Sequence, residues 1–261
     1  MTSNSTSRRL RRALALPDTA LQLRQLHVPW ADPFGTFKPI KRATVSLCAV
    51  GSFAHFFVAN RLRVEGQEVL DALPRSNVLF VMNHQTYFMD MIGFYWVVSS
   101  PNPFHHRPWI YFVADRKTMQ KNVVTEKLFR FAGLVGVNRT WKEGDTRIKR
   151  AVDPKDQQAV GSALDDGWVV TFPQGTTQPF APVRRGSARI IQTYRPLVVP
   201  VVIDGFGEAF PKGGLWPRKR GVDLSVRVKP PLELDYDVPV DELTATIAEA
   251  IEQSPRSASR G

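Results

Sequence analysis

The sequence has a single cysteine among its 261 residues, and this excludes two kinds of site. Cys48 has no second cysteine with which to form an intrachain disulfide, and a cysteine-based metal site needs several thiolates. The Gly-x-Ser-x-Gly pattern of a nucleophilic serine at a strand-to-helix turn is also missing. A serine nucleophile of that kind is therefore not expected.

The N-terminus lacks the apolar core of a secretory signal. Its first residues, MTSNSTSRRLRRALALP, are basic and rich in Ser and Thr, and arginines interrupt the short apolar stretch. We expect residues 1–23 to form a basic flexible tail in the cytoplasm, either solvated or in transient contact with anionic headgroups. Residues 254–261 are predicted to be a disordered tail.

Basic residues outnumber acidic ones. The chain has 35 Lys and Arg against 24 Asp and Glu, a formal net charge of +11, which favours polyanionic partners such as nucleic acid, anionic lipid or phosphorylated substrates. No zinc-finger, RNP or helix-turn-helix pattern occurs, so nucleic acid is not predicted as a partner. With 43% hydrophobic and 23% charged residues, the composition is that of a folded, non-polytopic protein.

Residues 24–61 are predicted to be a membrane-associating helical segment. Aromatics, prolines and bases are mixed in its first half, as is common at a polar–apolar interface. Residues 43–60 carry no formal charge and approach the length of a bilayer span, but His55, Asn60 and small polar residues dilute them. A core helix, a monotopic helix in one leaflet and a true span all remain open, and membrane contact is favoured.

Residues 62–253 alternate short apolar runs with helical patterns, which predicts one catalytic α/β domain. Its mixed, largely parallel sheet would be flanked by helices. Strands are expected at 77–84, 109–115, 134–139, 168–175, 197–205 and 222–230. Helices are expected at 87–98, 117–133, 153–167, 187–195 and 241–253, the last with Asp241 as its N-cap.

Two polar loops would follow strands at one edge of this sheet, where open α/β folds gather functional residues. His84 comes directly after the apolar run VLFVM, and Asp90 lies six positions later. A carboxylate beside an imidazole fixes its tautomer and stabilises the imidazolium, so the pair could act as a general base. Such pairs also arise by chance, and a purely structural role stays open on these residues alone.

Four motifs that occur in one order favour a catalytic role for His84 and Asp90 over a purely structural one. They are NHQTYFMD at 83–90, GLVGVNR at 133–139, FPQGTT at 172–177 and LVVPVVIDG at 197–205. Their order resembles the lysophosphatidic acid acyltransferase branch of the phospholipid and glycerol acyltransferases. The resemblance covers about residues 61–230.

The resemblance implies transfer of an acyl group from a coenzyme A or acyl carrier protein thioester to an acceptor such as 1-acylglycerol 3-phosphate. It implies an enzyme held peripherally or monotopically at the cytoplasmic face of the cell membrane, with membrane lipid and the thioester as partners and with no metal or bound cofactor. By motif position His84 would be the general base, Asp90 its orienting partner and Arg139 the ligand of the acceptor phosphate. The acceptor loop would contain Gln174, Gly175, Thr176 and Thr177. The oligomeric state is not readable.

The spacing between His84 and Asp90 departs from the family. Five residues separate them where the family has four. On a continuous helix one extra residue would turn Asp90 away by about 100°. We therefore expect a widened turn at 85–87 that takes up the insertion before the helix begins.

The acceptor loop departs as well. Gln174 stands where the family usually has Glu, and Thr177 where many members have an Arg. A Gln amide both donates and accepts hydrogen bonds but carries no charge. Arg184 and Arg185 could supply the missing cation, or could be two exposed arginines at a helix start. An acceptor without a phosphate monoester and a catalytically silent lipid-binding relative both remain open.

Three further segments are candidates for contact with lipid or with the acyl donor. Phe94, Tyr95 and Trp96 could line an acyl channel or belong to the core. Residues 115–117 could meet the donor's phosphates. The basic WPRKR at 216–220 could rest on anionic headgroups or be a solvated loop.

Overall fold

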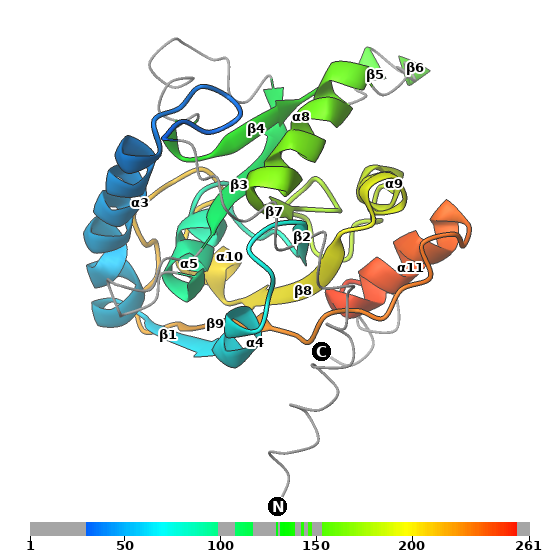
Figure 1. Cartoon of the computed structure of the whole chain (residues 1–261). Helices are drawn as coiled ribbons and strands as arrows, with labels where there is room; N and C mark the ends of the chain where they lie inside the picture. Colours follow the sequence, from blue (N-terminus) through cyan, green and yellow to red (C-terminus); the bar gives the residue numbers. More distant parts are fainter. Residues whose placement is uncertain are drawn as a thin grey trace, which may run out of the picture.

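A single large sheet organises the described part of the chain, residues 30–98, 108–116, 129, 131–138, 142–143, 146–147 and 153–254 of a computed structural model. Within these ranges the sheet has seven strands in the order β1-β9-β8-β2-β7-β3-β4 (Figure 1). They are β1 (Arg61–Glu65), β2 (Val78–Met82), β3 (Trp109–Asp115), β4 (Leu134–Val137), β7 (Gly167–Thr171), β8 (Leu197–Asp204) and β9 (Asp223–Val228). The short strands β5 (Lys142–Glu143) and β6 (Thr146–Arg147) pair separately.

The sheet is mixed and largely parallel, as the sequence predicts. Strands β4, β3, β7, β2 and β8 run in one direction, and β8 pairs with β9 in the antiparallel sense. The runs VLFVM of β2 and GWVVT of β7 are buried along their whole length. Continuous apolar runs of this kind form parallel strands because helices cover both faces.

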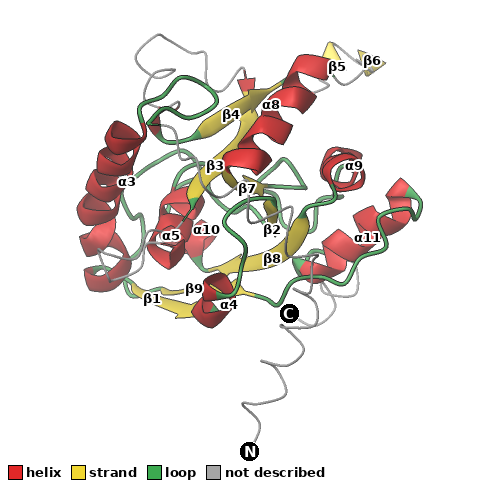
Figure 2. Cartoon of the chain, viewed as in Figure 1, coloured by secondary structure: helices red, strands yellow, loops and turns green. Residues whose placement is uncertain are grey.

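Helices cover the sheet on both sides (Figure 2). They are α3 (Lys38–Phe53), the π-helix η1 (Ala54–Val58), α4 (Gln67–Asp71), α5 (Met89–Val98), α8 (Pro154–Asp166), α9 (Arg185–Tyr194), α10 (Phe206–Ala209) and α11 (Val240–Ala250). In the described ranges, α4, α5 and α10 share one buried apolar cluster with the sheet, and α8, α9 and α11 share another. Strand β2 alternates between the two, with Phe80 in the first and Leu79 in the second.

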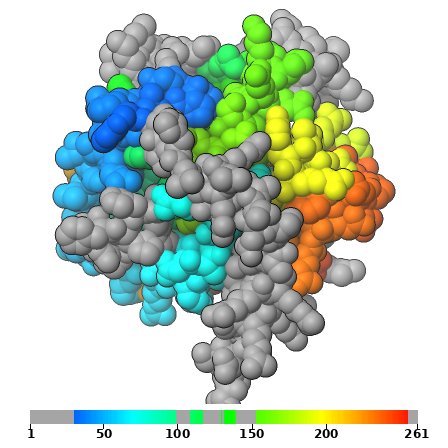
Figure 3. Space-filling model, viewed as in Figure 1, coloured from blue at the N-terminus to red at the C-terminus, as the bar shows by residue number. Residues whose placement is uncertain are grey.

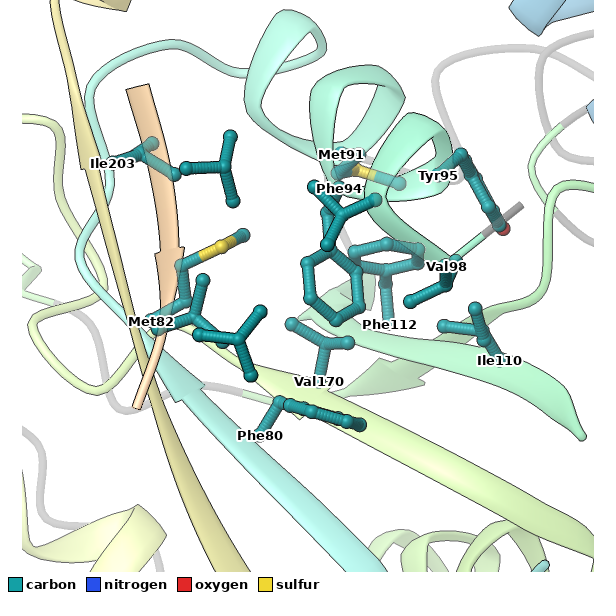
Figure 4. Packing of buried hydrophobic residues seen from close by; sticks show 14 of the residues in the cluster. Phe80, Met82, Met91, Phe94, Tyr95, Val98, Ile110, Phe112, Val170 and Ile203 are labelled. Atoms are coloured by element: carbon teal, nitrogen blue, oxygen red, sulfur yellow. The ribbon is translucent and has the colours of Figure 1, made fainter. Parts of the chain in front are cut away.

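The apolar helix α5 belongs to the core. Phe94 is fully buried and contacts Phe80 edge-on at 5.1 Å between ring centroids (Figure 4). The Tyr95 hydroxyl donates to the Ala132 carbonyl at 2.6 Å, and the Trp96 indole N–H donates to Ser52 of α3 at 3.0 Å. Helix α5 therefore joins the sheet to the N-terminal helix.

Helix α3 lies at the outer side of the molecule (Figure 3) and begins inside the segment predicted to associate with membrane. In the described ranges no helix is both long enough and apolar enough to cross a bilayer. Two basic residues of its first turn are buried in the protein and do not lie at the surface. Lys38 Nζ pairs with Asp166 at 2.6 Å, and Lys41 Nζ lies 3.6 Å from Asp32 and 3.6 Å from the centre of the Tyr111 ring.

Several boundaries differ from the prediction. The N-cap of α11 is Pro239, so Asp241 lies within the first turn, where a negative charge faces the positive end of the helix dipole. Strand β1 was not predicted, although RLRVE alternates charged residues at exposed positions with apolar residues at half-buried ones, which is the pattern of a strand. Most of the predicted helix 117–133, the tail 1–23 and residues 255–261 lie outside the described residues.

We expect the stability of the protein to depend on pH through Lys41. Burial lowers the pKa of Lys41 from 10.5 to about 8, and Asp32 offsets this only in part. Between these pH values the unfolded chain binds a proton on Lys41 that the folded chain does not, so the contribution of Lys41 to the free energy of unfolding rises with pH, by up to about 3 kcal/mol. In urea unfolding from pH 8 to 10.5, the free energy of unfolding of the wild type minus that of Lys41→Met should increase with pH. The exposed Lys155→Met is the control, and a constant difference for Lys41→Met would contradict the assignment.

Candidate active site

Two loops meet at the edge where the parallel strands end. Strands β2 and β7 pair in register, with Val81 opposite Thr171, so the loops that follow them start side by side. His84 belongs to the first loop and Phe172 to the second, and their rings lie 4.1 Å apart at a tilt of 32°. The predicted neighbourhood of His84 and the 172–177 loop is therefore present in the structure.

The residues on either side of His84 are bound to β8. The Asn83 side chain donates to the Ile203 carbonyl at 2.8 Å and accepts from the Ile203 N–H at 2.7 Å. The Gln85 amide donates to the same carbonyl at 3.0 Å and accepts from the Gly207 N–H at 2.9 Å. These bonds continue the pairing of β2 with β8 through side chains, so the backbone at His84 is held on both sides.

His84 and Asp90 form the predicted pair. His84 Nδ1 lies 2.8 Å from Asp90 Oδ2. The Asp90 carboxylate is 0% exposed, and it also accepts from the Gln85 N–H at 2.6 Å, the Thr86 N–H at 3.0 Å and the Thr86 hydroxyl at 2.7 Å. The donors on both sides of the carboxylate leave Asp90 Oδ2 oriented toward the imidazole, whose N–H it can accept.

The extra residue between His84 and Asp90 is taken up before the helix, as predicted. Residues 83–88 are not helical, and α5 begins at Met89, which places Asp90 in its first turn. Thr86 Oγ accepts from the Asp90 N–H at 3.1 Å while donating to its carboxylate, a reciprocal contact that closes the start of the helix. The carboxylate also faces the positive end of the helix dipole.

The second ring nitrogen of His84 is available. With Nδ1 donating to Asp90, the neutral ring has its lone pair on Nε2. In the part of the chain that the structure describes, no group hydrogen-bonds to Nε2, and the side chain is 13% exposed. The arrangement can remove a proton from a group that approaches Nε2.

The acceptor loop is held by a turn and by the C-terminal segment. The Gly175 N–H donates to the Phe172 carbonyl at 2.9 Å, and Gly175 has φ +63°, which suits glycine. Gln174 is 2% exposed, and its amide donates to Ala181 O at 3.0 Å and to Gln253 Oε1 at 3.1 Å. Gln174 thus faces the protein and ties the loop to the residues after α11.

The two threonines of the loop and the two arginines after it lie in different surroundings. Thr177 is buried, and Thr176 Oγ accepts from the Gln178 N–H at 3.3 Å. Arg185 forms two hydrogen bonds of 2.7 Å with Asp241. Arg184 is exposed, and its N–H donates to the Pro173 carbonyl at 2.9 Å, so it stays beside the loop.

The end of β4 is held by a charge that the sequence analysis did not single out. Asp156 of α8 accepts from Arg116 at 2.5 Å and from the Asn138 N–H at 2.6 Å. Arg116, expected near the donor's phosphates, is therefore bound within the protein. Arg139 and Lys117 lie outside the described residues.

Asn83, Gln85 and Thr86 are the other residues that sequence reasoning missed. Only Thr86 had a local signal, since a threonine shortly before an acidic residue at a helix start is a capping pattern. Metal ligands do not gather in the ranges described here, where no three His, Cys, Asp or Glu side chains are close enough to share an ion.

Comparisons with known proteins identify a family and a similar fold. Residues 61–204 match the family model described as Acyltransferase. The fold is similar to the crystal structure of the 1-acyl-sn-glycerophosphate acyltransferase PlsC from Thermotoga maritima, with a TM-score of 0.58, 18% identity, and coverage of 89% of this chain and 84% of that chain. At this identity the likeness shows the fold alone. A search of curated proteins finds no match.

We expect Gln174→Glu to destabilise the protein above the pKa of the new carboxyl. The carboxylate would face the oxygens of Ala181 and Gln253 in a buried place, at a cost of about 1–3 kcal/mol or more. Gln174→Met, which removes the donors without adding charge, is the matched control. Urea unfolding at neutral and acidic pH should show the Glu variant recovering stability as the carboxyl is protonated. Equal stability of the Glu variant and the wild type at neutral pH would contradict the buried contact.

Proposed function

Because this chain belongs to the acyltransferase family, we propose that it moves a fatty acyl group from a coenzyme A or acyl carrier protein thioester to the hydroxyl of a lysophospholipid. The favoured acceptor is 1-acylglycerol 3-phosphate. The order of the four motifs supports this choice, and so does the fold shared with an enzyme named for acting on 1-acyl-sn-glycerophosphate.

The observation that carries the proposal is the orientation of His84, with Nδ1 bound to Asp90 and Nε2 available. His84 Nε2 takes the proton of the acceptor hydroxyl as its oxygen attacks the thioester carbonyl. The carbon–sulfur bond then breaks, and the leaving thiolate receives the proton from the imidazolium. Asp90 stabilises the imidazolium between the two transfers. Donor and acceptor supply all the reacting atoms, so no cofactor is required.

The acceptor phosphate is proposed to lie by the 172–177 loop. Arg184 is exposed beside this loop and is the described cation best placed to bind phosphate, together with Arg139 by motif position. Gly175, Thr176 and Thr177 would contact the acceptor, whereas Gln174 would keep the loop in place.

We also propose that the enzyme acts peripherally or monotopically at the cytoplasmic face of the cell membrane. Helix α3, its N-cap residue and the π-helix η1 that follows it present large apolar side chains to solvent, which supports contact with one leaflet. The exposed residues are Phe37, Ile40, Leu47, Val50, Phe53, Phe57 and Val58.

We expect His84→Ala to lower kcat/KM for acyl transfer by about 10²- to 10⁴-fold, because the base is lost. The assay uses purified enzyme, an acyl thioester and a panel of acceptors: 1-acylglycerol 3-phosphate, a lysophosphatidylcholine and a lyso-aminolipid. Thermal unfolding checks that the variant is folded. Undiminished transfer by His84→Ala would exclude it as the base, and a wild type that acylates only acceptors without a phosphate monoester would overturn the proposed acceptor.

We expect Arg184→Gln to raise KM for 1-acylglycerol 3-phosphate about tenfold, because a charge-assisted hydrogen bond to phosphate is lost. KM for an acceptor without phosphate should not change. Arg185→Gln is the matched comparison, and its effect should be smaller because Asp241 already binds that guanidinium. A larger effect of Arg185→Gln would assign the phosphate to the other arginine.

A further inference from the structure

The loop between α10 and β9 exposes a large aromatic side chain. We call residues 211–221 the Trp216 loop. Trp216 is 76% exposed and Leu215 is 52% exposed, although both are large and apolar. Tryptophan in such a place is common at membrane surfaces, where its ring fits the headgroup region.

The Trp216 loop is fixed at its base. The Arg218 guanidinium donates to the carbonyls of Glu208 at 3.1 Å and Gly207 at 2.5 Å, and the Arg218 N–H donates to Ala209 O at 2.8 Å. Lys219 forms an ion pair with Glu208. The exposure of Leu215 and Trp216 is thus the result of a loop held against α10.

The loop continues the apolar surface of the N-terminal helices. The Trp216 ring lies 4.9 Å from the ring of His55 in η1, and the Gly221 N–H donates to the Ala59 carbonyl at 2.7 Å. The exposed Phe57 and Val58 belong to the same helix end. Segments far apart in the sequence therefore form one exposed apolar area.

The loop also contacts the segment that contains His84. The Tyr87 N–H donates to the Lys212 carbonyl at 2.7 Å, and the Tyr87 ring lies 6.3 Å from that of His84. The loop is bound to helix α10, and the Gly207 N–H of that helix donates to the Gln85 side-chain oxygen at 2.9 Å. A membrane surface bound by the Trp216 loop would therefore lie close to His84.

The positive charge of the Trp216 loop indicates the kind of membrane surface that it would bind. Lys212, Arg218, Lys219 and Arg220 are exposed, and Glu208 neutralises one of them. Basic residues next to an exposed Trp suit a leaflet with anionic headgroups. We propose that the Trp216 loop is a second membrane anchor, which inserts Leu215 and Trp216 among anionic phospholipids and brings the His84 loop to the lipid surface. The proposal rests on the proposed function for its purpose, but binding can be measured without catalysis.

The test is sedimentation of the full chain with vesicles in the absence of acyl donor. One set contains phosphatidylcholine alone, and the other contains equal parts of phosphatidylcholine and phosphatidylglycerol. We expect Trp216→Ser to weaken binding to the anionic vesicles about tenfold. The double variant Lys212→Gln/Arg220→Gln, which leaves the anchoring Arg218 and Lys219 intact, should weaken it about 10- to 30-fold.

The matched control is Lys155→Gln/Arg189→Gln, which removes the same charge from exposed positions on α8 and α9, across the sheet from η1. It should bind nearly as well as the wild type. If the control double variant lost as much binding as the loop double variant, the overall charge of the protein would drive binding. If the wild type bound both kinds of vesicle equally well, anionic phospholipid would not be the partner. Either result overturns the proposal, as does wild-type binding by both loop variants. Loss of binding in the loop variants alone supports it, even if no acceptor is acylated.

Discussion

The buried carboxylate of Asp90 is the constraint on which the site depends. A charge without solvent must be met by donors, since an unpaired buried charge is very costly. Here two backbone N–H groups, the Thr86 hydroxyl and His84 Nδ1 converge on it. The loop before α5 can satisfy this carboxylate only in a shape that curls around it, and that shape sets the direction of the imidazole.

The same loop is held from the other side by β8. Asn83 and Gln85 both bind the backbone of Ile203, about 120 positions away in the chain. The site therefore requires that β8 lie beside β2 in the observed register. In the proposed acyl transfer this placement matters, because the proposed base must be held accurately against the reacting groups. The core of α5 beneath the loop supports it further.

The N-terminal helix shows how charge and apolar surface are divided. Lys38 and Lys41 join the start of α3 to the protein, and burial of Lys41 is tolerated because Asp32 and the Tyr111 ring face it. The apolar side chains of the same helix stay outside. The lysines thus orient the helix, and its opposite, apolar face is left exposed, where the proposed membrane contact would lie. The Trp216 loop adds its aromatic and basic residues beside η1, at the end of this segment.

The sequence by itself determined the elements and contacts that depend on near neighbours. Apolar runs predicted β2, β3 and β8. The spacing of His84 and Asp90 predicted a turn before the helix, because two residues six positions apart meet or not according to the local backbone conformation. Only the tertiary structure decided the partners of polar side chains far apart in sequence. Gln174 faces Gln253, Arg185 is bound by Asp241, and Lys38 by Asp166. Such pairs depend on how strands and helices are placed in three dimensions, and no local pattern records that placement.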